Sequence, residues 1–368
     1  MLGVGLSAGL LAAGGVVLAL ATPAGALTTI TVANNADTGA GSLRQAFVDA
    51  SSGGVDQGVD VQIVVPAPVG QINLSSQLLY DGGAGGAHTL TLSGGGNTVH
   101  ETIANRVIAD TGTGLLTVSG LTITGGQDDG GGINTSGSLT ITNVQISGNS
   151  GVRGGLLVHG SLTMTNSTIS GNTSSNAGGV GGAEADGSAT VINSTISGNS
   201  APTGFGGITA NTVTLVYATI TDNTGVSTAN VRAATATFDS FGSVVASPHL
   251  GPNCANTATS HGFNLEDDAA ATCGFSTATA DLAPGTNPNV GALANNGGPT
   301  QTLLPQAGSP LIDAIPTASC QSDGATGVTT DQRGVTRPQG PGCDIGAVEV
   351  AISSAAAAPL VITPRFTG

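Results

Sequence analysis

Apolar and polar residues alternate in short stretches that recur through the middle of the chain. In each stretch an apolar residue occupies every second position and a Gly-Asn pair ends the run, as at 138–149, 161–172, 188–199 and, more loosely, 212–223. A spacing of two predicts β-strands with one buried face. One register position is always Ile and recurs at steps of 23, 23, 27 and 24 residues, at Ile123, Ile146, Ile169, Ile196 and Ile220.

Each repeat therefore predicts two or three short strands joined by tight corners, and no window of the repeats offers 10–12 residues with the 3.6-residue period of a helix. Stacked repeats of about 23 residues form a solenoid of parallel strands, in which each coil adds about 4.8 Å. We expect Ile146, Ile169 and Ile196 to lie in vertical contact. We also expect an amide ladder at one corner, in which each side chain bonds the next, formed by Asn143, Asn166 and Asn193.

The ends of a solenoid need covering, since open strand edges aggregate. Ser42 is suited to cap a short helix that presents Leu43, Ala46 and Phe47 on one face. The expected organisation is a signal peptide (1–26), an N-terminal cap with degenerate first coils (27–110), regular repeats (111–250), a C-terminal region (251–350) and a flexible tail (351–368).

The signal peptide is indicated by an apolar run from Leu2 to Leu20 and an A-x-A pattern that ends at Ala26. Its first residues carry no Lys or Arg, which departs from the usual pattern. An uncleaved membrane anchor is the alternative. No later stretch is long and apolar enough to predict a transmembrane segment in the mature chain.

Composition narrows the class of fold. The chain has 60 Gly, only 2% aromatic residues and 8% charged residues, which favours a thin, regular core over an irregular globule. Its net charge is −15, and all seven basic residues are Arg. This balance argues against nucleic acid and anionic membranes as partners, because both need clusters of basic side chains.

Four cysteines fit an exported protein with two disulfides. Three pairings are possible, and the two local ones are favoured: Cys254 with Cys273, and Cys320 with Cys343. No pair has the spacing of a zinc site.

The last third of the chain carries an ordered series of motifs, at 260–265, 273–275, 295–300, 308–313, 331–334, 337–338 and 343–349. The series resembles the C-terminal region of bacterial exported proteins called choice-of-anchor Q domain proteins, and residues 30–47 resemble their usual opening. The resemblance implies a right-handed parallel β-helix on a secreted or cell-surface protein. It supplies no catalytic residues. The tail has no sortase-type motif, so release or non-covalent wall association is expected as much as anchoring.

These C-terminal motifs place two of the seven arginines beside three acids. We interpret the group as a structural ion-pair cluster rather than a binding site, formed by Asp331, Arg333, Arg337, Asp344 and Glu349.

Candidate chemistry within the repeats is sparse. Asp128 and Asp129 lie in a Gly-rich corner typical of a turn, and Arg153 and Arg232 stand in no recognisable motif. The register aligns three polar residues on successive coils, namely Ser136, His159 and Asp186. Neighbours about 4.8 Å apart are too distant for the contacts of about 2.6–3.2 Å that a catalytic triad needs. An outward polar turn is therefore expected, with a weak cation or sugar contact as the lesser hypothesis for His159, Glu184 and Asp186.

The sequence thus predicts an all-β, right-handed parallel β-helix with a short N-terminal capping helix and a loop-rich, disulfide-bonded C-terminal region. The favoured function is a non-enzymatic role in adhesion, matrix or surface binding, with an extracellular polysaccharide or cell-surface component as partner. The alternative is a polysaccharide-active lyase or glycoside hydrolase. No cofactor, metal site or catalytic residue is predicted.

Overall fold

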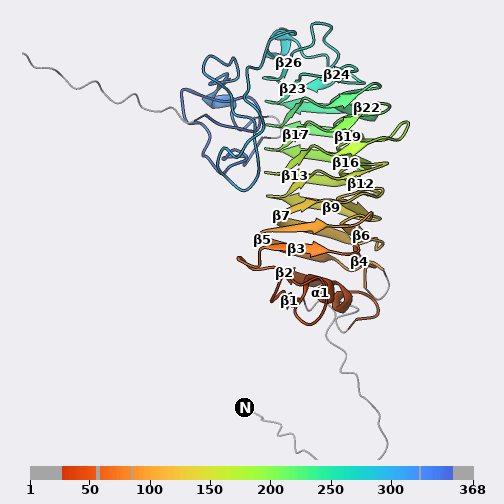
Figure 1. Cartoon of the computed structure of the whole chain (residues 1–368). Helices are drawn as coiled ribbons and strands as arrows, with labels where there is room; N and C mark the ends of the chain where they lie inside the picture. Colours follow the sequence, from red (N-terminus) through yellow and green to blue (C-terminus); the bar gives the residue numbers. More distant parts are fainter. Residues whose placement is uncertain (1–26, 55–58, 84–85, 323–324, 351–368) are drawn as a thin grey trace, which may run out of the picture.

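The computed structural model describes residues 27–54, 59–83, 86–322 and 325–350. The chain winds through them as a parallel β-helix, and the C-terminal region lies against one side of its upper half (Figure 1). The all-β fold class is therefore confirmed. The expected signal peptide (1–26) and tail (351–368) lie outside the described residues.

Each coil passes through three stacks of parallel strands, some of which run through a bend from one stack into the next. Stack 1 contains β1 (Thr28–Thr31), β2 (Val61–Val64), the first half of β5 (Leu90–Glu101) and of β7 (Leu115–Thr124), β9 (Ser138–Thr142), β13 (Leu162–Thr165), the second half of β16 (Ala183–Ile192), of β19 (Ile208–Val216) and of β22 (Val231–Phe241), and β25 (Thr259–Ser260).

Stack 2 follows in each coil. It contains β3 (Gln71–Leu74), the second half of β5 and of β7, β10 (Gln145–Ser147), β14 (Thr168–Ser170), β17 (Thr195–Ser197), β20 (Thr219–Thr221), β23 (Val244–Ala246) and β26 (Leu265–Glu266). A small sheet comes next, formed by β11 (Ser150–Gly151), β15 (Thr173–Ser174), β18 (Ser200–Ala201), β21 (Thr224–Gly225) and β24 (His249–Leu250). Stack 3 closes the coil with β4 (Leu78–Tyr80), β6 (Ile108–Asp110), β8 (Ile133–Thr135), β12 (Leu156–Val158) and the first half of β16, β19 and β22.

The predicted isoleucine column forms the centre of stack 2. Its members are register partners from β7 through β10, β14 and β17 to β20, and each is 0% exposed: Ile123, Ile146, Ile169, Ile196 and Ile220. Aliphatic side chains on adjacent coils thus share one continuous core.

The bend between stacks 1 and 2 uses a left-handed residue on each coil. Asn143, Asn166 and Asn193 have φ values of 55°, 49° and 44° there. Apart from Gly, Asn is one of the residues that adopt this conformation most readily. The bend therefore explains why Asn ends the first strand of the repeat.

The prediction that these three amides bond to one another is wrong. Asn193 Nδ2 donates to the Thr330 carbonyl at 2.7 Å, and Asn166 Oδ1 has no hydrogen-bond partner among the described residues. The rule that alternate residues share a face holds for extended backbone. A residue with positive φ leaves that alternation, so these side chains do not join the inward column.

The amide ladder lies at the next corner instead. There a left-handed residue (Gly148, Gly171, Gly198 or Asp222, with φ between 58° and 68°) precedes an Asn that is at most 1% exposed. Each Nδ2 donates to the Oδ1 of the next coil at 2.9–3.0 Å, along Asn149, Asn172, Asn199 and Asn223. The chain continues through Asn230 and Asn253 and ends on the carboxylate of Asp267. A carboxylate only accepts, so it terminates a row of amides that all donate in one direction.

The predicted capping helix is present as α1 (Leu43–Ala50), the one α-helix among the described residues. The Ser42 hydroxyl accepts a hydrogen bond from the Gln45 N–H at 3.1 Å and so caps the first turn. Leu43, Ala46 and Phe47 are buried, and the helix packs against β4 and β2 at the bottom of the solenoid (Figure 1).

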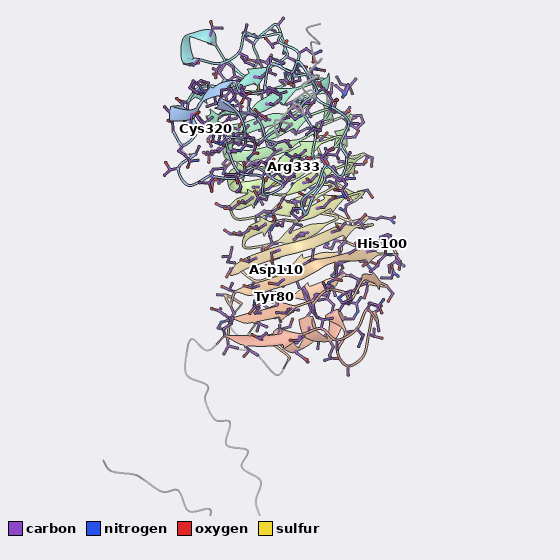
Figure 2. All side chains as sticks on the ribbon, turned by 90° about the vertical axis from the view of Figure 1, so that its left-hand side faces the viewer. Tyr80, His100, Asp110, Cys320 and Arg333 are labelled. Carbon is purple, nitrogen blue, oxygen red and sulfur yellow. A yellow bond between two sulfur atoms is a disulfide. The ribbon has the colours of Figure 1, made fainter. Side chains whose placement is uncertain are left out.

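The C-terminal region is loop-rich, with short 3-10 turns at Thr277–Thr279 and Thr317–Ser319 and one antiparallel pair, β27 (Ile315–Pro316) with β28 (Gly342–Cys343). Disulfides join Cys254 to Cys273 and Cys320 to Cys343, the two local pairings. Figure 2 places Cys320 and Arg333 over the upper coils, whereas Tyr80 and Asp110 lie in the lower ones. A separate apolar cluster joins the region to the solenoid and includes Tyr217, Phe241, Leu311, Ile315 and Ile345.

Candidate functional site

The outward positions of stack 1 carry Thr on six successive coils. The register aligns them in a first column of Thr91, Thr117, Thr140, Thr163, Thr190 and Thr214. Two residues further along the strands, a second column contains Ser93, Ser119, Thr142 and Thr165. We name these ten residues the Thr face. Neighbours in a column are about 4.8 Å apart, and the two columns are about 6.7 Å apart.

The Thr face is held rigidly and its hydroxyls are free. Leu139 and Ile141, which flank Thr140, are at most 1% exposed, so the strand is anchored by its inward side. Each Thr-face residue is half-buried, and none of the ten hydroxyls hydrogen-bonds another residue in the described part of the chain. The face carries no charge. Its hydroxyls can therefore donate to, and accept from, an external partner.

At the upper end of the Thr face, acidic and apolar residues replace Thr and Ser at the outward positions. The first column continues from Thr214 to Asp239, and the second continues from Thr165 through Ile192 and Val216 to Phe241. Two cavities adjoin this end. One, of about 290 Å³, lies between the strands and residues 326–330 of the C-terminal region, and the other, of about 430 Å³, contains Asp239.

The structure brings together two of the three aligned residues of stack 3. His159 Nδ1 lies 2.7 Å from Asp186 Oδ2, and both side chains are about half exposed. The expectation that the coil spacing keeps these groups apart is wrong for this pair, because the side chains reach across the gap between strands. Ser136 is exposed, and its backbone N–H donates to the Asp110 carbonyl. Its side chain makes no hydrogen bond to another described residue. The arrangement is a His–Asp pair and not a triad.

Glu184 forms an ion pair with Arg153. Arg153 Nε donates to Glu184 Oε2 at 2.6 Å, and Arg153 Nη1 lies 3.4 Å from Asp129 Oδ2. The hydrogen bond that Arg153 donates to Glu184 raises the pKa of Arg153 above its ordinary value. Arg153 is therefore held as a cation between two acids, which makes it unsuited to take up a proton.

Asp128 pairs with Arg106, a residue to which the sequence assigned no role. Arg106 Nη2 lies 2.7 Å from Asp128 Oδ2, and this hydrogen bond lowers the pKa of Asp128. The corner borders a cavity of about 320 Å³ lined by residues 127–129, 150–152, 173 and 175–176. Because Arg106 and Arg153 pair with Asp128 and Asp129, the corner has little uncompensated charge for a cation.

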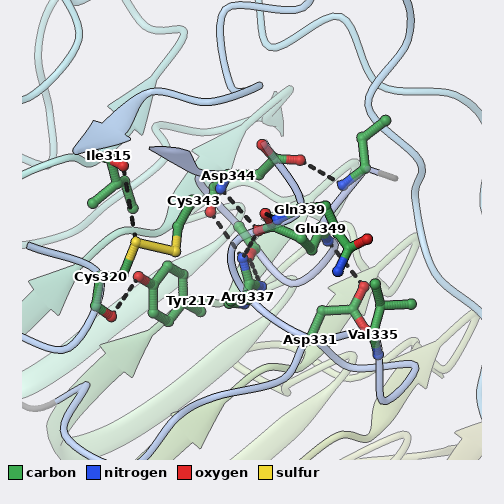
Figure 3. A network of polar contacts seen from close by, with 12 residues as sticks. Tyr217, Ile315, Cys320, Asp331, Val335, Arg337, Gln339, Cys343, Asp344 and Glu349 are labelled. Carbon is green, nitrogen blue, oxygen red and sulfur yellow. Dashed lines mark hydrogen bonds and ion pairs between the residues drawn. A yellow bond between two sulfur atoms is a disulfide. The ribbon is translucent and has the colours of Figure 1, made fainter. Parts of the chain in front are cut away.

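The five residues of the predicted ion-pair cluster lie together. Figure 3 shows four of them, namely Asp331, Arg337, Asp344 and Glu349. Arg337 Nη1 lies 3.0 Å from Glu349 Oε2, and the two side chains are 0% and 1% exposed. The Arg337 guanidinium lies 4.2 Å from the centre of the Tyr217 ring. Burial lowers the pKa of Arg337, and the charge of Glu349 opposes this shift. The pair thus ties the C-terminal motifs to the coil that contains Tyr217.

The other three cluster residues organise the surrounding backbone. Asp331 pairs with Arg333 at 2.8 Å and accepts hydrogen bonds from the backbone N–H groups of Val335 and Glu349. Asp344 accepts from the Asp313 N–H at 2.7 Å. Burial raises the pKa of Asp344 to about 6, although the hydrogen bonds that Asp344 accepts from the Asp313 and Val350 N–H groups oppose this shift.

Gln332, between Asp331 and Arg333, is a contact that the sequence analysis missed. Its Nε2 donates to Thr168 Oγ1 at 2.8 Å, and its Oε1 accepts from Thr195 Oγ1 at 2.7 Å. The side chain is 1% exposed. The 331–334 motif therefore docks on stack 2 of the solenoid.

Within the described ranges, no group of three or more His, Cys, Asp or Glu side chains is arranged to hold a metal ion. A search of the same residues found no helix with the length and hydropathy of a membrane span.

Comparison with known proteins identifies the solenoid. A family model described as a right-handed β helix region matches residues 95–271, from β5 to just beyond β26. Searches of curated proteins and of solved structures found no match to the chain. The family match agrees with the stacked parallel coils, so the protein contains a right-handed parallel β-helix.

Proposed function

We propose that the protein is secreted or displayed on a cell surface, where it binds an extracellular polysaccharide without cleaving it. The observation that carries the proposal is the Thr face, whose ten unbonded hydroxyls repeat at the coil spacing. A polymer with a regular series of hydroxyl groups can bond to such an array at many points. Two disulfides support export, because such bonds persist in oxidising compartments.

The arrangement of acids supports binding over cleavage. Glycoside hydrolysis generally uses two carboxylates that flank the bond to be broken. Between Thr91 and Thr214 the two columns of the Thr face contain no carboxylate. Among the carboxylates between these positions in the sequence, Asp129 and Glu184 pair with Arg153, Asp128 pairs with Arg106, and Asp186 pairs with His159. The alternative, a polysaccharide-active enzyme of the β-helix type, would need a different site.

The proposal is tested by a double substitution, Thr140→Val with Thr163→Val. Val keeps the shape and strand preference of Thr but removes two central hydroxyls. If each bonds the ligand for about 0.5–1.5 kcal/mol, binding weakens about fivefold or more. The assay is affinity electrophoresis or calorimetry of the purified chain against a panel of soluble polysaccharides.

The matched control is Thr98→Val with Thr122→Val. These two are also register partners, half-buried and outward, but they lie beyond the bend in stack 2. Wild-type affinity in this control, with equal thermal stability in both variants, supports the proposal. Equal weakening in both double variants contradicts it. Release of reducing ends by the wild-type chain favours the enzymatic alternative.

A further inference from the structure

A cavity lies at the upper end of the Thr face, across three successive coils. It has a volume of about 430 Å³ and is lined by Thr214, Leu215, Val216, Asp239, Ser240, Phe241 and His261. This volume falls within the range of about 300–1,000 Å³ that small-ligand sites occupy. Because the first column of the face ends at Thr214 and Asp239 is the register partner of Thr214 on the next coil, a polymer that follows the column enters the cavity.

One wall of the cavity is a hydrogen-bonded acid and imidazole. His261 Nε2 lies 3.1 Å from Asp239 Oδ1, and the side chains are 37% and 35% exposed. Asp239 Oδ2 and His261 Nδ1 have no hydrogen-bond partner in the described part of the chain. The pair therefore holds the carboxylate in place and leaves one oxygen and one ring nitrogen for a ligand.

Apolar groups from the second column lie beside this pair. Val216 and Phe241, which are 3% and 1% exposed, are register partners on adjacent coils. A pyranose ring has an apolar C–H side and an edge of hydroxyl groups. Val216 and Phe241 are almost fully buried and form only the floor of the cavity, so the part of a pyranose that matches the site is its hydroxyl edge, at Asp239 Oδ2 and His261 Nδ1.

The charge of the lining residues favours uncharged sugars over uronates. The lining residues contain one carboxylate and no Lys or Arg. A uronate would bring its own carboxylate against Asp239 with no basic group to pair it, at a cost in desolvation and repulsion. The site therefore disfavours acidic polysaccharides.

We propose that this cavity is a subsite for one uncharged pyranose unit of the polysaccharide that lies on the Thr face. One hydroxyl of the unit donates to Asp239 Oδ2, and a neighbouring hydroxyl bonds His261 Nδ1. The inference rests on the proposed function and adds to it a class of sugar and a place where one unit is fixed.

The experiment compares Asp239→Asn with Asp222→Asn. Asp222 is a matched control, because it also lies beside a histidine of an adjacent coil, with His249 Nε2 at 3.6 Å, but outside the cavity. The probes are dextran, galactomannan and arabinoxylan as uncharged polymers, polygalacturonate as an anionic one and chitosan as a cationic one. At least one uncharged polymer should bind the wild-type chain more tightly than the two charged ones do. Its Kd should rise about tenfold or more in Asp239→Asn, because a hydrogen bond to a charged acceptor is lost.

The outcomes separate this inference from the proposed function. An unchanged Kd in Asp239→Asn, with weakened binding in Thr140→Val/Thr163→Val, overturns the subsite and leaves the proposed function standing. An equal rise in both Asp variants, or tighter binding of polygalacturonate or chitosan, also overturns the subsite. Absence of binding to every polymer overturns both.

Discussion

Each regular repeat carries two asparagines that backbone conformation directs to different places. Asn143 has φ 55° and lies at the bend, outside the inward column, whereas Asn149 follows the left-handed Gly148 and is 1% exposed. A buried amide needs partners, and Asn149 has them in Ile123, Ser147 and Asn172. The residue type is the same, so the position of the left-handed residue decides which asparagine enters the core.

Asp110 is a carboxylate inside the solenoid. It is 3% exposed, and its two oxygens accept hydrogen bonds from Thr135 Oγ1 and the Gly112 N–H, each at 2.8 Å. Burial raises the pKa of Asp110 above its ordinary value, and these hydrogen bonds only partly offset the shift. The charged form is therefore penalised in the folded state relative to the unfolded state.

Asp110→Asn should make stability less dependent on pH. Since the folded-state pKa is raised, Asp110 costs nothing when it is neutral in both states, below about pH 4, and it costs most once pH exceeds the folded value. The variant removes this cost, so its free energy of unfolding should gain on the wild type as pH rises from 4 to 7. Urea titrations at several pH values measure the gap. A gap that stays constant, or that shrinks as pH rises, contradicts the burial argument.

At the scale of elements, the C-terminal region acts as a clamp along the upper coils. Its Gln301 contacts Gln145, its Gln332 bonds Thr168 and Thr195, and its Arg337 lies over Tyr217. These partners belong to four successive coils. A segment that bonds several coils at once resists their separation, which a solenoid with nearest-neighbour contacts alone does not. The buried Arg337–Glu349 pair lies beside Tyr217, on the last of these four coils.

Glu349→Gln should destabilise the protein strongly. Removal of one partner leaves the Arg337 guanidinium buried without its counter-ion, and such losses typically cost about 3–5 kcal/mol. Asp128→Asn is the control, since its pair with Arg106 is partly exposed and is expected to be worth at most about 1 kcal/mol. Urea unfolding of both variants measures the difference. Equally small changes in the two would show that the clamp does not depend on the buried pair.

Across the whole molecule, the sequence predicts the features that depend on periodic, inward-facing residues. The coil length, the isoleucine column, the capping helix and the local disulfides follow from spacing and residue type. The sequence analysis did not predict the Thr face, because it treated outward residues as ordinary solvent-exposed positions. Thr140 and Thr163 nevertheless lie in the regular repeats 138–149 and 161–172. The signal was available as Thr at alternate positions on the face opposite Leu139 and Ile141.

Contacts between distant segments could not be predicted in this way. Gln332 and Thr168 are 164 residues apart, and no pattern in either segment indicates the other. The path of the C-terminal region over stack 2 depends on packing of its loops. The cavity at Asp239 is lined by side chains of three successive coils, and the pattern within one repeat does not indicate it. The sequence grouped the charged C-terminal residues, but it gave no location for them on the solenoid.

The most direct test of the Thr face as a binding surface uses a single introduced thiol. All four cysteines are in disulfides, so Thr163→Cys creates one reactive group on the face, and Thr98→Cys creates one beyond the bend. The measurement is the rate of alkylation by iodoacetamide, with and without a saturating amount of the tightest-binding uncharged polysaccharide. We predict that the polymer slows the reaction at position 163 about tenfold or more and leaves position 98 unchanged. An unaltered rate at position 163, or equal slowing at both positions, would contradict the account.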